Sequence, residues 1–246
     1  MAPRRSVVVS GLLFACAATV AADTKVVQES HQDSFTMMGQ TQPARDDQHV
    51  MWIGTDRMRV DRGSTSIVVR LDQNKMYIID HQEKTSSTVD LPLDLAKYLP
   101  AGMGAQMLKM MELEATVTPR SETRTVGSWT AHRYDVAMTS QMVTVEATYW
   151  ATTDVDVDVE LFYTLYEQML AAQPGMATIA TELRKIDGFI VEQQSVMRMT
   201  AMSDTAVRST QTTTSVEKQN PPQGTYDTPV GYQDRPFDLT SIAQRQ

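Results

Sequence analysis

Methionine is the residue type in this chain that most invites a chemical interpretation. Thioether sulfur is a soft ligand that favours Cu(I). Two groups among the 17 methionines could supply several such ligands, namely Met107, Met110, Met111 and Met197, Met199, Met202. Met197 and Met199 nevertheless alternate as the core residues of a strand do, no His or Cys lies near them in sequence, and methionine also fills irregular apolar space. We therefore expect no bound metal and no other cofactor.

The acidic run at residues 154–160, in which Asp or Glu alternates with Val, is spaced like the opening of a calcium-binding loop. An EF-hand loop needs Gly at its sixth position and Glu at its twelfth. Counted from Asp154, these positions hold Val159 and Leu165. The run is better interpreted as an acidic loop leading into a helix, whose first turn favours negative charge.

Catalytic motifs are absent from the sequence. The four histidines stand apart, at positions 31, 49, 81 and 132, and there is no Gly-x-Ser-x-Gly elbow, glycine-rich phosphate loop or paired cysteine. Asp80 and His81 adjoin, but neighbours on a strand point to opposite faces. The sequence therefore predicts a protein that is not an enzyme, although a triad assembled from distant residues would be invisible at this level.

The first 22 residues have the layout of a secretory signal peptide. Arg4 and Arg5 precede an apolar stretch at 7–20, which is short for a membrane span, and small residues then lead up to Asp23. We expect cleavage after Ala22 and a periplasmic location. The alternative is a lipid anchor on Cys16, although Phe14 fits the lipoprotein motif poorly.

Charge narrows the choice of partners. Removing residues 1–22 takes away two arginines and the single cysteine, so the formal charge changes from −8 to −10 and no disulfide can form. A strongly acidic chain without a basic patch does not attract nucleic acid or an anionic membrane surface. No later apolar stretch reaches the 18 residues of a transmembrane helix. We expect neither a nucleic-acid partner nor a transmembrane segment in the mature chain.

Period-two alternation of apolar and polar residues recurs along most of the chain. Between residues 50 and 91 it forms short runs separated by turn residues, which is typical of an antiparallel meander. Long alternating runs return in the second half of the sequence. The expected strands are 24–38, 50–61, 67–71, 76–79, 85–91, 114–118, 124–126, 131–138, 143–152, 189–201 and 206–217, with a loop at 39–47.

Helical spacing interrupts the strands twice. A first segment, at 92–111, begins at Pro92 and Asp94 and is kinked or ended by Pro100 and Gly102 before the methionines resume the spacing. In the second, Asp158 is predicted as the N-cap of a helix that Pro174-Gly175 ends, and a further apolar stripe follows over 176–183.

Together these elements predict an α+β fold. A sheet of about ten strands tends to curl, and amphipathic helices need an apolar surface to cover. We expect a strongly curved antiparallel sheet, an open half-barrel, with the helical inserts covering its concave face. One domain would span 23–232, with 226–232 against the sheet and 233–246 as a flexible tail.

Several runs together resemble a known family. They are 52–61, 75–80, 126–136, 147–151, 187–191 and 226–232, and they occur in the order expected of the exported domain-of-unknown-function 4412 family. That family is similar to the lipoprotein carriers of the LolA and LolB type. The resemblance implies an open barrel with a helical lid that holds acyl chains or lipidated peptides. It carries over no functional residue, and Arg59 with Asp61 is interpreted as a cross-strand structural pair.

Two functions follow from these expectations. The first is an exported binding protein that holds an apolar ligand, such as an acyl chain, a lipid or a lipidated protein, between sheet and helices. A flexible, polarizable methionine lining suits such a cavity. The predicted ligand-binding residues are Met103, Met107, Met110, Phe162, Leu165, Tyr166 and Met169. The alternative is an interaction or sensor module that engages another envelope protein without a small-molecule ligand.

Overall fold

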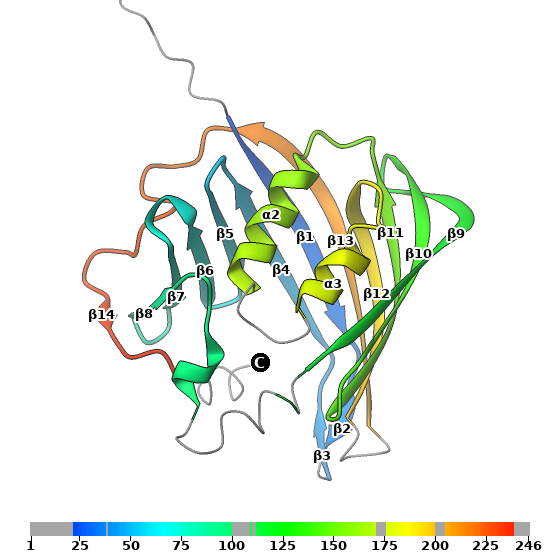
Figure 1. Cartoon of the computed structure of the whole chain (residues 1–246), viewed down its shortest axis with the longest axis horizontal. Helices are drawn as coiled ribbons and strands as arrows, with labels where there is room; N and C mark the ends of the chain where they lie inside the picture. The colour runs from blue at the N-terminus through cyan, green and yellow to red at the C-terminus, as the bar shows by residue number, and fades with distance from the viewer. Residues whose placement is uncertain are drawn as a thin grey trace, which may run out of the picture.

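Alternating side chains form strands along most of the chain. The computed structural model describes residues 22–37, 39–99, 109, 112–170, 176–199 and 205–238. The strands are β1 (Asp23–Gln32), β2 (Phe35–Met37), β3 (Gln40–Gln42), β4 (Arg45–Ile53), β5 (Arg57–Arg62), β6 (Thr65–Arg70), β7 (Lys75–Asp80), β8 (Thr85–Asp90), β9 (Glu114–Val126), β10 (Trp129–Thr139), β11 (Val143–Thr152), β12 (Phe189–Met199), β13 (Ala206–Gln219) and β14 (Gln233–Asp234). The helices are α2 (Val159–Leu170) and α3 (Met176–Leu183), and the 3-10 turns are η1 (Leu71–Gln73) and η2 (Leu95–Tyr98) (Figure 1).

Twelve of these strands form one sheet in the order β14-β8-β7-β6-β5-β4-β1-β13-β12-β11-β10-β9. The two halves of the sheet meet where β1, near the start of the chain, pairs antiparallel with β13 near its end. The sheet is mixed, because β14 runs parallel to β8. The remaining strands, β2 and β3, form a separate hairpin.

The expected α+β half-barrel with a helical lid is wrong. The described chain is mostly β, with only two α-helices, and its sheet is neither closed nor strongly curled. Strand number alone suggested curling, since closure removes the exposed edges of a large sheet. Here the edges are covered by other means. The two residues of β14 pair with one edge strand, β8, and Glu182 of α3 accepts a hydrogen bond from the backbone of Val117 on the other, β9, at 2.8 Å.

Local signals placed the second helical interruption correctly. Asp158 caps α2, because its carboxylate accepts a hydrogen bond from the backbone N–H of Leu161 at 2.9 Å. The two helices then run over 159–170 and 176–183, as their spacing predicted. In the first interruption the described part is the single 3-10 turn η2, capped by Asp94, and most of 100–111 lies outside the described residues.

Most strand predictions are confirmed. The runs 114–118 and 124–126, expected as two strands, form the single strand β9, and the other exceptions lie at turns. β11 has the bounds that its alternation predicted. The run 50–61 divides into β4 and β5, because the chain turns at 54–56. Residues 39–47, expected as a loop, contain β3 and the start of β4. No helix within the described ranges is both long and apolar enough to cross a bilayer.

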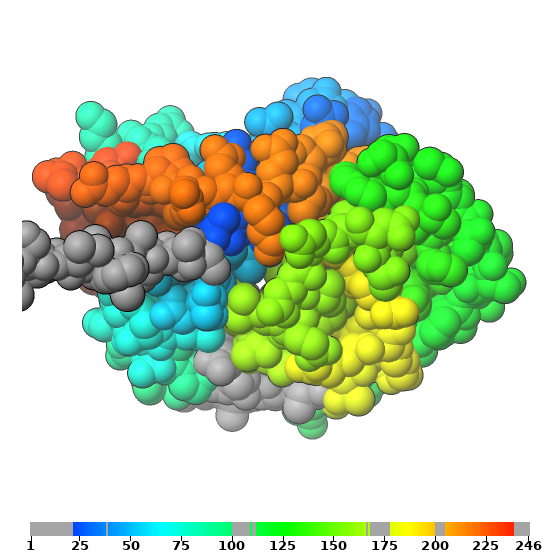
Figure 2. Space-filling model, turned by 90° about the horizontal axis from the view of Figure 1, so that it is seen from above, coloured from blue at the N-terminus to red at the C-terminus, as the bar shows by residue number. Residues whose placement is uncertain are grey.

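The two faces of the sheet are covered by different parts of the chain. One face, here called the helix face, packs against α2 and α3 through two apolar clusters that include Leu165 and Ile179. On the opposite, outer face, Trp52, Val68 and Ile79 pack against Tyr226. Figure 2 shows the orange C-terminal part of the chain on the side away from the yellow-green and yellow helices. The expectation that 226–232 lies against the sheet is confirmed.

Candidate functional site

A pocket of about 250 Å³ lies between the two helices and the helix face of the sheet. It draws on α2, α3 and seven strands, so residues from most of the chain converge on it. The residues that line this helix-face pocket are Gln28, Met51, Val60, Arg62, Met138, Tyr149, Val159, Phe162, Tyr163, Leu183, Gly188, Phe189, Ile190, Gln193 and Gln211. Most of these side chains are aliphatic or aromatic, as is usual for small-molecule sites.

The turn before β12 positions one wall of the pocket. Gly188 has a φ of +93°, and a Cβ on it would lie 2.3 Å from the backbone oxygen of Thr152, so only glycine fits there. This close approach brings Phe189 into the wall. Its ring packs edge-on against that of Phe162 on α2, with centroids 5.9 Å apart. The helix and the strand are thereby held together at the pocket.

A row of three glutamines, Gln28, Gln211 and Gln193, crosses the largely apolar pocket on adjacent strands β1, β13 and β12. Gln211 Nε2 donates to Gln28 Oε1 at 2.5 Å, and Gln28 Nε2 donates to Thr213 Oγ1 at 3.1 Å. Gln193 lies directly opposite Gln211 in the strand register. The glutamine row thus supplies amide groups in a fixed arrangement.

The pocket wall disfavours ionisation. Burial raises the pKa of Tyr163 to about 12, since the phenolate would lose its hydration. The same loss of hydration would act on any acid placed beside this ring. The wall is therefore suited to uncharged groups.

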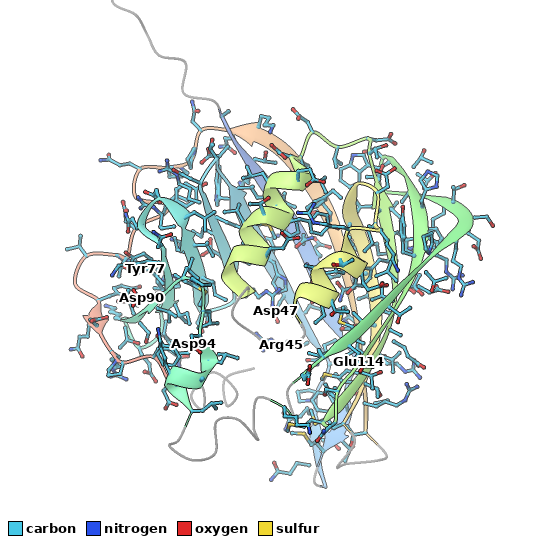
Figure 3. The ribbon with its side chains drawn as sticks, in the orientation of Figure 1. Arg45, Asp47, Tyr77, Asp90, Asp94 and Glu114 are labelled. Carbon is cyan, nitrogen blue, oxygen red and sulfur yellow. The ribbon has the colours of Figure 1, made fainter. Side chains whose placement is uncertain are left out.

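Charge enters the described lining at one place, Arg62, which is exposed at the rim. Arg62 lies opposite His49 in the strand register. Burial lowers the pKa of His49, and the nearby Arg62 cation lowers it further. Its Nδ1 atom is buried and has no hydrogen-bond partner among the described residues. Further along β4, Arg45 and Asp47 form an ion pair at 2.5 Å, below the helices in the view of Figure 3.

The structure brings one predicted ligand-binding residue, Phe162, into the pocket lining. Leu165 is fully buried in the core and is not part of that lining. Tyr166 and Met169 lie on α2, but their side chains are outside the description. The three candidate methionines, Met103, Met107 and Met110, also lie outside the described residues.

Sequence reasoning missed the glutamine row, although a signal for it exists. Gln193 stands in phase with Phe189 and Val191, which are both buried on the same strand. A polar residue at an apolar phase of a strand points toward the core side and needs a partner there. Gln28 stands likewise in phase with the buried Val26.

A second polar cluster, on the outer face, contains a serine and a histidine. Ser66 Oγ lies 2.6 Å from His81 Nε2, it also contacts the Asp61 carboxylate, and His81 Nδ1 lies 2.9 Å from the Tyr232 hydroxyl. Ser66 has no exposed surface, so no substrate reaches its hydroxyl. We interpret the cluster as a structural attachment of the C-terminal part of the chain to β6 and β7.

The residue pair Arg59 and Asp61 belongs to the same cluster. The two side chains are 2.7 Å apart but lie on one strand, β5, so their interpretation as a cross-strand pair is wrong. Arg59 also donates to the backbone oxygen of Thr225 at 2.9 Å. Its role is to hold the C-terminal part of the chain.

Metal ligands do not gather in the part of the chain that the structure describes. No three His, Cys, Asp or Glu side chains there come together in a way that could hold an ion. In the acidic run, Asp158 caps α2 and Asp154 accepts a hydrogen bond from the backbone of Thr130 at 3.1 Å. Met197 and Met199 are half-buried on β12.

The outer face of β9 to β13 carries a second hollow, wide and shallow, of about 640 Å³. Its lining is mostly polar and includes Arg133 and Asp135, which form an ion pair at 2.9 Å. Such a surface is typical of a solvated sheet face.

Comparisons with known proteins leave the geometry as the main guide to function. A scan against models of known protein families finds none that matches this chain. A search of curated proteins finds no similar one either.

Proposed function

We propose that this chain is an exported, non-enzymatic protein that binds one slender apolar chain, such as the acyl chain of a lipid or of a lipidated peptide, in the helix-face pocket. The observation that carries the proposal is the pocket itself, which has aliphatic and aromatic walls from both helices and seven strands. Burial of apolar surface against such walls is the main source of affinity for a hydrocarbon ligand.

The size of the pocket supports a narrow ligand. Its volume of about 250 Å³ lies just below the roughly 300 to 1,000 Å³ of sites for drug-sized molecules. A single hydrocarbon chain needs a narrower pocket than a ring system does. The lining comes from strands between β5 and β10 in the sheet order, which agrees with an extended ligand.

Export rests on the sequence. The basic start, the apolar stretch and the small residues before Asp23 support cleavage after Ala22 and a periplasmic location, with a lipid anchor on Cys16 as the alternative. The resemblance to the domain-of-unknown-function 4412 family and to lipoprotein carriers stays a prediction, and it agrees with an apolar cargo.

A pocket-filling substitution tests the proposal. Val60→Trp places an indole in the pocket, whereas Val230→Trp makes the same change at a side chain that is fully exposed. Binding is measured by displacement of a fluorescent acyl probe and by the rise in melting temperature. A ligand at a hundredfold excess over its Kd adds about 2.7 kcal/mol to the free energy of unfolding, and the melting temperature rises with it. We expect Val60→Trp to weaken binding at least tenfold and Val230→Trp to leave it unchanged.

Two results would contradict the proposal. One is a folded wild-type protein that binds no acyl probe and carries no lipid when taken gently from its own envelope into native mass spectrometry. The other is equal binding by both tryptophan variants. The alternative, an interaction with another envelope protein, would then have its surface at the open hollow on the outer face of β9 to β13.

A further inference from the structure

The glutamine row is unusual because it lies on the helix face among apolar neighbours. Each amide can donate two hydrogen bonds and accept two. Gln28 uses its oxygen to accept from Gln211 and its nitrogen to donate to Thr213. The direction of these bonds fixes the orientation of both amides, so the Gln211 oxygen is left on the side away from Gln28.

Hydrogen-bonding capacity remains at the far end of the row. Within the described residues, neither the Gln193 side chain nor Gln211 Oε1 has a hydrogen-bond partner, although both residues line the pocket. Half-buried amide groups beside apolar walls are normally satisfied by protein, water or ligand. This end of the pocket therefore offers a ligand both an acceptor and a donor.

Charge is remote from this end. Arg62 lies on β5 and Gln193 on β12, four strand steps apart in the sheet order, which is a path of roughly 19 Å measured along the sheet at the usual spacing between strands. No other charged side chain belongs to the described lining. A carboxylate at Gln193 would lose its hydration without gaining a cation, which is costly.

We infer that the pocket selects a ligand whose hydrocarbon chain carries an uncharged group that both donates and accepts hydrogen bonds. That group, an amide or a hydroxyl, lies at Gln193 and Gln211. This inference rests on the proposed function and names the class of ligand for the same site. An ester of the same chain accepts but cannot donate, so the Gln211 oxygen stays unpaired. An ionised acid lacks the donor as well and also carries the cost of desolvation. The free energy lost when one neutral hydrogen bond is left unmade corresponds to a loss of roughly fivefold to tenfold in affinity.

Four ligands with one saturated chain test the inference: the primary amide, the alcohol, the methyl ester and the carboxylate. Each competes with a fluorescent acyl probe for the purified exported protein at pH 7.5. We expect the amide and the alcohol to bind at least fivefold more tightly than the ester and the carboxylate.

The variant that decides the role of Gln193 is Gln193→Leu, with Gln193→Met as a second choice if leucine impairs folding. The amide, the alcohol and the ester can each accept a hydrogen bond from the Gln193 amide, so we expect either variant to weaken the binding of all three by roughly fivefold. The preference for ligands that donate should remain, because it depends on Gln211 Oε1. The control is Gln194→Leu, the next residue of the same strand, which is exposed on the outer face. It should bind the three ligands as tightly as the wild type does.

The possible failures are distinguishable. Equal binding of all four ligands would overturn the inference and leave the pocket as a binding site. Tightest binding of the carboxylate, lost in Arg62→Gln, would also overturn it, because the head group would then lie at the opposite rim. Absence of binding by every ligand would instead contradict the proposed function.

Discussion

The proposed function depends most on single polar residues of the helix face. The glutamine row stands among apolar side chains of the pocket, where a leucine or valine would need no hydrogen-bond partner. The Nδ1 atom of His49 is buried without a partner among the described residues. Polar groups in such places need partners. Their positions support a site that recognises a polar group on an otherwise apolar ligand.

His49 should make stability depend on pH. Burial, and next the Arg62 cation, lower its folded-state pKa below the ordinary 6.5, so the unfolded chain takes up a proton that the folded chain resists. The contribution of His49 is therefore complete above pH 6.5 and is lost as the pH falls below it. We expect urea unfolding to show a smaller loss of stability between pH 7.5 and pH 5 in His49→Gln than in the wild type.

His31 serves as the control with the opposite sign. A hydrogen bond from its ring to Asp46 raises its pKa, so it favours the folded state at acid pH and loses this effect as the pH rises. His31→Gln should consequently increase the loss of stability on acidification. An unchanged pH dependence in His49→Gln would show that this imidazole titrates as it does in the unfolded chain.

At the scale of elements, short contacts decide how the helices and edge strands are held. The turn at Gly188 fixes the start of β12 beside the end of β11, and Asp158 fixes the start of α2. Both features are local in sequence, yet both determine the walls of the pocket.

Gly188→Ala tests the turn. The methyl group would collide with the Thr152 backbone at 2.3 Å, in addition to the strain of a positive φ. Gly224 has a similar φ of +82° but nothing within 4 Å of the added Cβ, so Gly224→Ala isolates the strain. We expect a loss of about 1 kcal/mol for Gly224→Ala and of at least roughly 3 kcal/mol for Gly188→Ala, measured by chemical unfolding. Equal losses would mean that the turn relaxes away from Thr152.

Glu182 should guard the edge strand β9. Its carboxylate accepts the Val117 N–H at 2.8 Å and is paired with Lys185 at 2.6 Å. An exposed edge N–H is a template for pairing with another chain. Glu182→Ala should increase self-association in sedimentation experiments. The control is Glu122→Ala, at an exposed position of β9 itself, which should not increase it. A monomeric Glu182→Ala protein at high concentration would refute this role.

At the scale of the whole molecule, the start of β1 is joined to the segment that follows β13. The Tyr226 hydroxyl donates to the Asp23 carboxylate at 2.6 Å, and the Tyr226 ring is buried against Trp52, Val68 and Ile79. Arg70 lies 3.4 Å from Asp227 and adds a second attachment. Asp23 is also the residue that would begin the chain after cleavage at Ala22.

Tyr226→Phe should therefore destabilise the protein although the ring remains. We expect a loss of about 1.5 to 3 kcal/mol, the usual range for a hydrogen bond to a charged group. The control is Tyr77→Phe, whose hydroxyl donates to Gln73 at an exposed site and should cost less than about 0.5 kcal/mol. A double-mutant cycle with Asp23→Asn measures the coupling, and additive losses would exclude the proposed link between the two ends.

Local structure followed from the sequence by itself. Period-two alternation determined the bounds of β11, and a polar residue before an apolar stripe determined the cap of α2. These features depend on neighbours a few residues apart, so the printed order of side chains contains them. The acidic balance of the chain is of the same kind.

The tertiary structure decided what lies beside what. Alternation tells which residues share a face of one strand, but not which strands are neighbours, so the pairing of β1 with β13 and the open sheet could not be derived. The same limit hid the pocket. Gln28 and Gln211 are separated by more than half the chain, and only the pairing of their strands brings their amides within 2.5 Å.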